Sequence, residues 1–270
     1  MSRGKLIKCR YRILVKAFPQ PSKKHEETVC CAGITEDGSQ LHRLYPIRYR
    51  RLSSENQFNR FDLVEMDVEK STSDNRPESY RISEDSIRII QAGNQLSATD
   101  KAKLWKPFVV ESLPELEHQR EATGRSLGII KAPIDSLEFY RESVKKQNTD
   151  DMAISNSLFE QISLIEDPLR KLERPEYDFR YRFISGGIKY TRKLTDWEPY
   201  AAWFKFKRKY GKDAFKYLKK AYQEELPKQN LHFILGTVKS HQHRFIIIGL
   251  LRTKEDLDMV DSQGSLDLKI

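Results

Sequence analysis

Basic and aromatic side chains alternate along residues 177–183, which read Tyr-Asp-Phe-Arg-Tyr-Arg-Phe. Successive side chains of a β-strand point to opposite faces, so this pattern predicts one aromatic face and one face that carries Arg180 and Arg182. Two glycines and a second basic run at 188–194 follow, which predicts a hairpin. Single-stranded nucleic acids bind surfaces that combine rings with cations. In the alternative interpretation, the rings form the core and the arginines are solvated.

A second group of arginines and tyrosines lies between residues 43 and 60, where the only acid is Glu55. Its members are Arg43, Tyr45, Arg48, Tyr49, Arg50, Arg51 and Arg60. Guanidinium groups pair with phosphate oxygens and tyrosine rings stack on bases, so the group predicts a nucleic-acid surface. The alternative is a solvated loop that follows a strand.

Arg76 and Arg81 flank a short segment that contains Pro77 and Glu78, and both are candidates for the same surface. Pro77 favours an extended backbone, from which Glu78 would orient Arg76 or Arg81 toward a ligand. In the alternative, Glu78 forms a structural ion pair.

A long helical region is predicted over 200–225, and it carries eight basic side chains opposed, up to Lys220, by Asp213 alone. Within it, the side chains predicted to bind phosphates are Lys205, Arg208, Lys209 and Lys212. The aromatic residues of this region cannot all face one core at 3.6 residues per turn, so some are expected at the surface. A membrane surface is the alternative partner, and the position of the helix between strands argues against it.

Asp196 and Glu198 are the candidate catalytic residues of an alternative function, a metal-dependent nuclease or another nucleic-acid-processing enzyme. In a nuclease both would be metal ligands. The row Glu65, Asp67 and Glu69 could supply further carboxylates, but alternating acids are also typical of a solvated strand face. The competing interpretation is that Thr195 or Asp196 caps the following helix, with Glu198 in its first turn. Nucleophile and phosphate-loop motifs are absent from the sequence, so we expect no catalytic centre and no cofactor or metal.

The composition favours a polyanionic partner. The 270 residues include 48 Lys and Arg against 39 Asp and Glu, a net charge of +9. Three cysteines, two of them adjacent, argue against a disulfide framework and for a reducing, cytoplasmic compartment. The longest apolar run, 245–251, is too short to span a bilayer, so we expect no membrane partner.

Strand-like segments occupy both ends of the chain and helix-like segments the middle. Strands are predicted at 8–16, 28–34, 40–45, 61–70, 126–131, 177–194, 231–238 and 244–252, and helices at 83–91, 98–109, 113–122 and 200–225. A polar stretch at 141–155 predicts a loop, and 158–165 a short helix. We predict an α+β protein with two OB-like β-barrels joined by helices. The expected domains are a barrel at 1–82, a helical connection at 83–172, a second β-rich domain at 173–254 and a disordered acidic tail at 255–270.

Seven short blocks, in this order, resemble the dual OB-domain proteins of bacteria and archaea. They are Ala32-Gly33-Ile34, Arg43-Leu44-Tyr45-Pro46, Asp74 to Tyr80, Ser126 to Lys131, Phe179 to Phe183, Thr195 to Glu198 and Phe233 to Thr237. The resemblance implies two OB-like barrels and a nucleic-acid-binding role in a genome-defence or mobile-element context. It carries no catalytic motif, so we expect nucleic-acid binding without catalysis, with RNA or single-stranded DNA as the partner. A third hypothesis is a protein-interaction subunit whose barrels bind a partner effector.

Overall fold

The computed structural model describes residues 5–22, 26–143, 176–239 and 241–253. The predicted helix at 158–165, the tail at 255–270 and all but the first three residues of the predicted loop at 141–155 lie outside the described residues.

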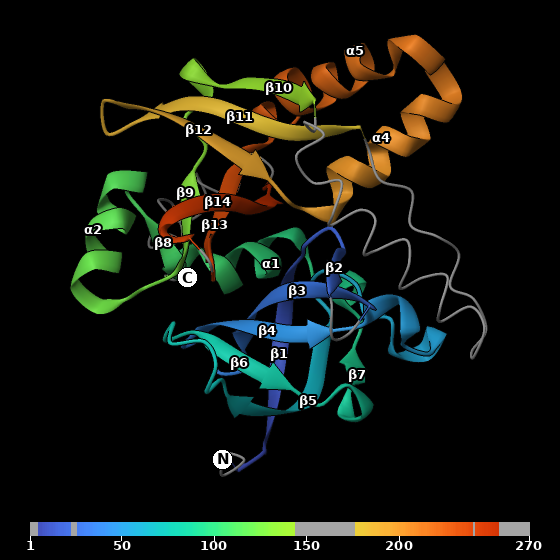
Figure 1. Cartoon of the computed structure of the whole chain (residues 1–270), viewed down its shortest axis with the longest axis vertical. Coiled ribbons are helices and arrows are strands. Elements are labelled where there is room, and N and C mark those ends of the chain that lie inside the picture. The colour runs from blue at the N-terminus through green and yellow to red at the C-terminus, as the bar shows by residue number, and fades with distance from the viewer. Residues whose placement is uncertain (1–4, 23–25, 144–175, 240, 254–270) are drawn as a thin grey trace, which may run out of the picture.

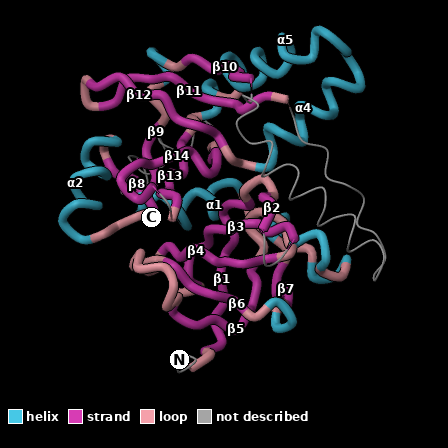
Figure 2. Tube along the Cα trace, viewed as in Figure 1, coloured by secondary structure: helices cyan, strands magenta, loops and turns pink. Residues whose placement is uncertain are grey.

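Five strands of the N-terminal half close into an OB-like barrel (Figures 1 and 2). The strands of this half are β1 (Ile7–Lys16), β2 (Gln20–Ser22), β3 (Glu26–Thr35), β4 (Leu41–Ile47), β5 (Leu63–Lys70), β6 (Ser79–Ile82) and β7 (Arg88–Gln91). The closed order is β1-β3-β4-β6-β5, because β1 pairs with both β3 and β5. Only the β4–β6 pair of the barrel is parallel. Alternate residues such as Tyr11, Ile13 and Met66 fill its interior.

The predicted helix at 83–91 is wrong. The structure has a 3₁₀ turn at Glu84–Ser86 and then strand β7, which pairs with β5. β7 includes Ile89 and Ile90, and β-branched side chains favour an extended backbone. The four predicted strands before residue 71 are all present, whereas β6 had no strand signal of its own.

The C-terminal half contains a seven-stranded mixed sheet that is not closed. Its strands are β8 (Val109–Val110), β9 (Leu127–Lys131), β10 (Glu138–Ser143), β11 (Tyr177–Ser185), β12 (Ile188–Leu194), β13 (His232–Val238) and β14 (His241–Leu251). Their order is β10-β11-β12-β14-β13-β9-β8. Of the two predicted OB-like barrels, the structure therefore has one as a closed barrel, while the second β-rich region is a sheet that does not close. Pro133 and the 3₁₀ turn Ile134–Ser136 separate β9 from β10, so β9 pairs with β13 while β10 pairs with β11.

Helices lie between and beside the strands. They are α1 (Ala98–Trp105), α2 (Leu113–Thr123), α4 (Trp197–Tyr210) and α5 (Ala214–Lys219), and α5 continues into a π-helical turn at Lys220–Glu225. Residues 83–143 thus hold α1 and α2 together with strands β7 to β10. In Figure 1, α4 and α5 form a helical hairpin at one edge of the C-terminal half. Gly211 ends α4 with a φ of 54°, a conformation that glycine adopts without strain.

The two halves share a hydrophobic core, in which Val15 and Ala32 of the barrel pack with Leu127, Ile234 and Trp105. β14 approaches β1 so closely that a Cβ atom on Gly249 would lie 2.1 Å from a Val15 methyl group. Glycine is therefore needed at this crossing. The barrel and the open sheet consequently form one packed unit.

Candidate functional site

The aromatic face of the predicted hairpin is core. Strands β11 and β12 form as expected, and Phe179, Tyr181 and Phe183 are buried against Phe139 and Phe233. These rings are unavailable for stacking on bases, so that part of the prediction is wrong.

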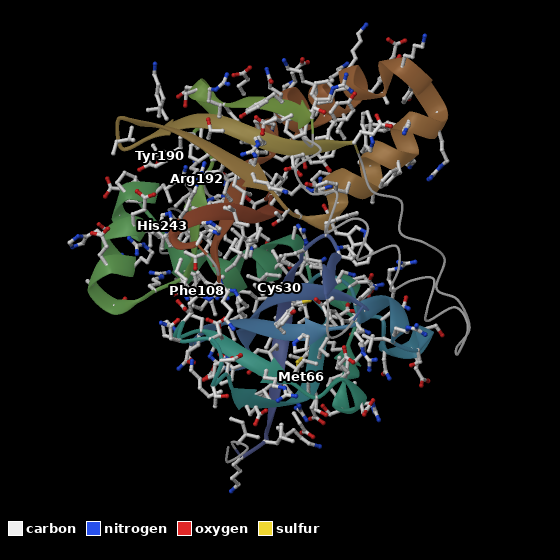
Figure 3. The ribbon with its side chains drawn as sticks, viewed as in Figure 1. Cys30, Met66, Phe108, Tyr190, Arg192 and His243 are labelled. Carbon is white, nitrogen blue, oxygen red and sulfur yellow. The ribbon has the colours of Figure 1, made fainter. Side chains whose placement is uncertain are left out.

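The basic face of the hairpin is paired with carboxylates from neighbouring strands. Arg180 contacts Glu142 at 2.7 Å, and Arg182 contacts Glu138 at 2.5 Å. On the opposite, buried face of β12, Arg192 lies against the ring of Tyr190 (Figure 3). Both side chains contact Glu117 of helix α2, Arg192 at 3.2 Å and Tyr190 at 3.0 Å. The cross-strand pairs of Arg180 and Arg182 stabilise the sheet and reduce the charge that this face offers to a ligand.

Arg43 and Arg76 hold the two halves together, and burial removes both from any surface interface. Arg43 donates to the Ser126 hydroxyl at 3.0 Å and to the carbonyl of Thr237 at 3.4 Å. Arg76 donates to the same Thr237 carbonyl and pairs with Asp74. Buried arginines with carbonyl and carboxylate partners are structural, so these two predicted phosphate contacts are wrong.

Glu78 also has a structural role. Its carboxylate accepts from the backbone N–H and the hydroxyl of Ser126, at 2.8 and 2.7 Å. The partner of Arg76 is Asp74 instead. Burial alone would raise the pKa of Asp74, but hydrogen bonds from Arg76 and Ser79 outweigh it and hold this pKa well below its usual range.

An OB fold usually binds oligonucleotides on the outer face of its second and third strands, which are β3 and β4 in this barrel. In this protein the C-terminal half covers part of that face.

The remaining basic candidates on the barrel are exposed or half-buried. Arg48 pairs with Glu84 at 2.7 Å, and Arg81 with Glu69 at 3.4 Å. Arg50 and Arg51 are half-buried on the short turn that also carries Tyr49. Tyr45 is exposed, and its hydroxyl accepts from that of Thr28.

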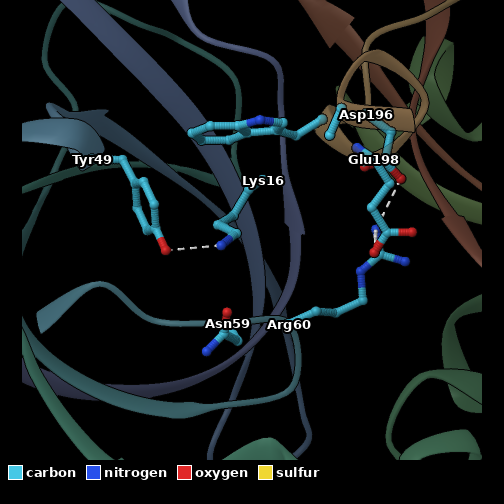
Figure 4. Close-up of a pocket in the computed structure, with 8 residues that line it drawn as sticks. Lys16, Tyr49, Asn59, Arg60, Asp196 and Glu198 are labelled. Carbon is cyan, nitrogen blue, oxygen red and sulfur yellow. Dashed lines mark hydrogen bonds and ion pairs between the residues drawn. The ribbon is translucent and has the colours of Figure 1, made fainter. Parts of the chain in front are cut away.

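A pocket brings together residues from two of the predicted groups, Tyr49 and Arg60 from the group at residues 43–60, and Asp196 and Glu198 from the candidate catalytic pair. It encloses about 410 Å³ and lies between the barrel and the start of α4 (Figure 4). The lining residues are Lys16, Tyr49, Asn59, Arg60, Asp196, Trp197, Glu198 and Ala201. The backbone holds the two walls in place, because the N–H of Phe18 donates to the carbonyl of Thr195 at 2.7 Å.

Asp196 is buried at the edge of this pocket and is fully hydrogen-bonded. One carboxylate oxygen accepts from the N–H of Glu198 at 3.2 Å, which caps α4 as the capping interpretation predicts. The other accepts from Arg60 at 2.8 Å and from the N–H of Leu250 at 2.9 Å. Within the described residues, no three His, Cys, Asp or Glu side chains gather as metal ligands do. The geometry of Asp196 is thus that of a structural carboxylate.

Lys16 places an amine among aromatic rings in the pocket. Its ammonium donates to the hydroxyl of Tyr49 at 3.0 Å and to the carbonyl of Phe58 at 2.8 Å. It lies 4.3 Å from the ring centroid of Tyr49 and 5.8 Å from that of Trp197. Burial lowers the pKa of Lys16 because desolvation disfavours the charged form.

The exposed face of α4 continues from the pocket as a row of cations. Glu198, Ala201, Lys205 and Arg208 are spaced three and four residues apart, which places them on one face of the helix, and Lys209 lies beside them. Lys205, Arg208 and Lys209 are exposed, and none of them forms an ion pair with a described residue. Lys212 is also exposed, in the turn that follows α4. We call Lys205, Arg208 and Lys209 the α4 basic row.

A pair of stacked tyrosines lies beyond the α4 basic row. Tyr210 and Tyr217 have ring centroids 3.8 Å apart and planes inclined by 17°, and Tyr217 is 41% exposed. This agrees with the expectation that some rings of the helical region reach the surface.

Four residues that line the pocket were not among the predicted site residues: Lys16, Asn59, Trp197 and Ala201. Asn59 lies in a loop that contains no motif, and Lys16 is at the end of the strand predicted at 8–16. Lys16 reaches the pocket because of its position at the end of β1. The next residue, Ala17, forms a β-bridge with Asp196.

Two family models match the chain. One, described as a domain of unknown function (DUF8758), matches residues 8–107, and the other, described as a domain of unknown function (DUF8757), matches residues 109–268. The junction falls just before β8, where the open sheet begins. No curated protein matches. Over the described residues, no helix is both long and apolar enough to cross a membrane.

One similar solved structure is a replication protein A heterotrimer bound to ssDNA. The similarity has a TM-score of 0.37 and 13% sequence identity, and it covers 98% of this chain and 55% of the other. The chain therefore spans about half the length of that protein chain.

Proposed function

Because the chain belongs to the DUF8757 family of domains of unknown function, we derive its role from its own surface and propose that it binds single-stranded nucleic acid, RNA or DNA. The sugar-phosphate backbone of the nucleic acid would follow the α4 basic row. Its bases would reach the stacked pair Tyr210 and Tyr217 at one end and the pocket at the other. Cations that track phosphates and rings that receive bases are the two parts that such binding requires.

The observation that carries the proposal is a contrast between two basic surfaces. Arg180 and Arg182 on β11 each have a carboxylate partner within 2.7 Å. In the α4 basic row, by contrast, the cations have no ion-pair partner among the described residues, and only Lys207, on the opposite side of the helix, pairs with Glu176. Like charges repel, so a row of cations without a carboxylate partner among the described residues favours an anionic ligand.

The strand order of the second half supports an OB-like origin, which we also propose. If β9 and β10 are taken as two halves of one strand, the order β10-β11-β12-β14-β13-β9 repeats that of the barrel, β1-β3-β4-β6-β5-β1. The parallel pair also corresponds, β12–β14 to β4–β6. On this proposal the chain is a dual OB protein whose second barrel is open at residues 132–137.

Charge reversal at two matched pairs of residues tests the function. Two double variants change the net charge by the same amount. They are Lys205→Glu with Arg208→Glu, and Arg180→Glu with Arg182→Glu. We expect the first pair to weaken binding of a labelled single-stranded oligonucleotide at least tenfold, and the second pair by less than threefold. Fluorescence anisotropy at fixed salt measures both, and circular dichroism confirms that the variants are folded. Equal losses would mean that net charge alone drives association, and no binding by the wild type would remove the proposal.

A further inference from the structure

The pocket at the start of α4 has ring faces on its walls. Tyr49 and Trp197 meet edge to face, with centroids 5.4 Å apart and planes inclined by 75°. Trp197 is half-buried, whereas Trp105 and Trp203 are buried. Of the three tryptophans, Trp197 is therefore the one that a ligand in the pocket can touch.

The polar groups of the pocket include both donors and acceptors. Asn59 is exposed, and its side-chain amide has no hydrogen bond to a described residue. Glu198 supplies an acceptor that is 56% exposed, and Lys16 supplies a donor. In Figure 4, Asn59 and Arg60 lie along one side of the pocket, and the amine of Lys16 points toward the hydroxyl of Tyr49. A mixture of this kind matches the edge of a heterocyclic base, which carries donors and acceptors together.

A phosphate group fits the same pocket poorly. Arg60, the strongest anion ligand present, is already paired with Asp196 at 2.8 Å and lies 3.4 Å from Glu198. Both carboxylates would repel an incoming anion. Phosphates are better served by the α4 basic row, which begins one helical turn beyond Ala201 on the same face.

We propose that the pocket receives one unstacked nucleobase of the strand that α4 binds, with the base against Trp197 and its edge toward Asn59. This proposal rests on the proposed function and adds to it a defined base subsite. The cavity of about 410 Å³ falls within the usual range, about 300–1,000 Å³, of small-molecule pockets. The distance from Glu198 to Arg208 along the helix is about 15 Å, so one strand can reach both the pocket and the basic row.

Ala201 offers a way to close the pocket without touching the Asp196 cap. It is exposed and lines the pocket, and leucine is a good helix former, so Ala201→Leu fills the space while the helix stays intact. Ala201→Ser is the matched control, because it changes the same residue and does not fill the pocket.

The experiment follows one titration with two signals. Anisotropy of a labelled single-stranded oligonucleotide reports binding, and tryptophan emission, with Trp197→Phe as the background, reports a base stacked on Trp197. We expect quenching with the wild type and with Ala201→Ser. With Ala201→Leu the quenching disappears and binding weakens about 5- to 150-fold, the range that one stacked base accounts for. An oligonucleotide without bases should bind α4 and leave the emission unchanged.

The outcomes separate the two proposals. Binding without quenching, or equal quenching by Ala201→Leu and Ala201→Ser, would overturn the base subsite and leave the proposed function standing. Quenching by the oligonucleotide without bases would likewise overturn it. Absence of any anisotropy change would overturn the proposed function and the subsite with it.

Discussion

Arg60 and Asp196, 136 residues apart in the chain, form an ion pair of 2.8 Å between the loop before β5 and the start of α4. The same carboxylate accepts from the N–H of Leu250 and caps α4 through the N–H of Glu198. Arg60 also donates to the carbonyl of Leu250. One buried carboxylate thus fixes where α4 begins, and with it the position of the α4 basic row relative to the barrel.

Replacement of Asp196 by asparagine should destabilise the protein by about 3 kcal/mol. Asparagine keeps the cap but removes the charge that compensates Arg60, and a buried charge left without its partner typically costs about 3–5 kcal/mol. Urea unfolding followed by far-ultraviolet circular dichroism measures the change. We expect a lower midpoint with an unchanged slope.

Glu198→Gln is the matched control for Asp196→Asn. Glu198 is 56% exposed, so loss of its charge should change the free energy of unfolding by less than about 1 kcal/mol. Similar midpoints for Asp196→Asn and the wild type would contradict the structural role. A different result would assign Asp196 to catalysis instead: the wild type cleaves RNA or DNA in the presence of a metal ion, and the Asp196→Asn variant is folded but does not.

His42 should make the stability depend on pH below about 6.5. Its ring is buried, stacks on Tyr80 at 4.0 Å and lies 3.1 Å from the Tyr11 hydroxyl. Burial, together with the charge of Lys70, lowers the pKa of His42 to about 4 from an ordinary 6.5. The unfolded chain therefore binds a proton that the folded protein rejects. The stabilisation is complete above pH 6.5 and is lost as the pH falls toward 4, at about 1.4 kcal/mol per unit.

The measurement for His42 is the free energy of unfolding at several pH values between 7 and 4, for the wild type and for His42→Gln. Glutamine has no charge to gain, so its profile should be flatter in this window. Parallel profiles would show that His42 titrates normally in the folded protein.

The alternation at 177–183 correctly predicted which residues share a face, because side-chain direction in a strand depends only on the backbone. It could not predict what covers each face. The carboxylates that pair with Arg180 and Arg182 come from β10, about 40 residues earlier, and the rings that bury Phe179 come from other elements. Local sequence could not predict the burial of Arg43 either, because its partner Ser126 is 83 residues away.

The spacing within α4 carried more information than the hairpin. Helical periodicity predicted basic side chains at the surface and rings that cannot all be buried, and the structure has Lys205 exposed, Trp203 buried and Tyr217 41% exposed. The pocket, in contrast, combines residues around positions 16, 49, 60 and 196. No local pattern connects these residues, since long-range strand pairing and the Arg60–Asp196 ion pair bring them together.

Gly249 and Val15 should show strong energetic coupling. A Cβ atom at Gly249 would lie 2.1 Å from a methyl group of Val15, so Gly249→Ala should destabilise the protein by about 2 kcal/mol or more through overpacking. Val15→Ala alone should also destabilise it, because it opens a cavity. The double variant should be less destabilised than the sum of the two single variants by at least about 1 kcal/mol. The methyl group added at position 249 would occupy the space that Val15→Ala opens. A double-mutant cycle in urea measures this, and additive effects would mean that β1 and β14 separate easily.

The salt dependence of binding should identify the α4 basic row as the phosphate-contacting surface. On single strands, the logarithm of the affinity falls with the logarithm of the salt concentration by about 0.7 for each phosphate contacted. Neutralising Lys205, Arg208 and Lys209 to glutamine should therefore reduce the slope by about 2. Neutralising Arg180 and Arg182, which are already paired with Glu142 and Glu138, should leave it within about 0.5 of the wild type. Anisotropy titrations at several salt concentrations provide the slopes. A wild-type affinity that does not change with salt, or an equal reduction in both variants, would exclude the α4 basic row as the site where the phosphates bind.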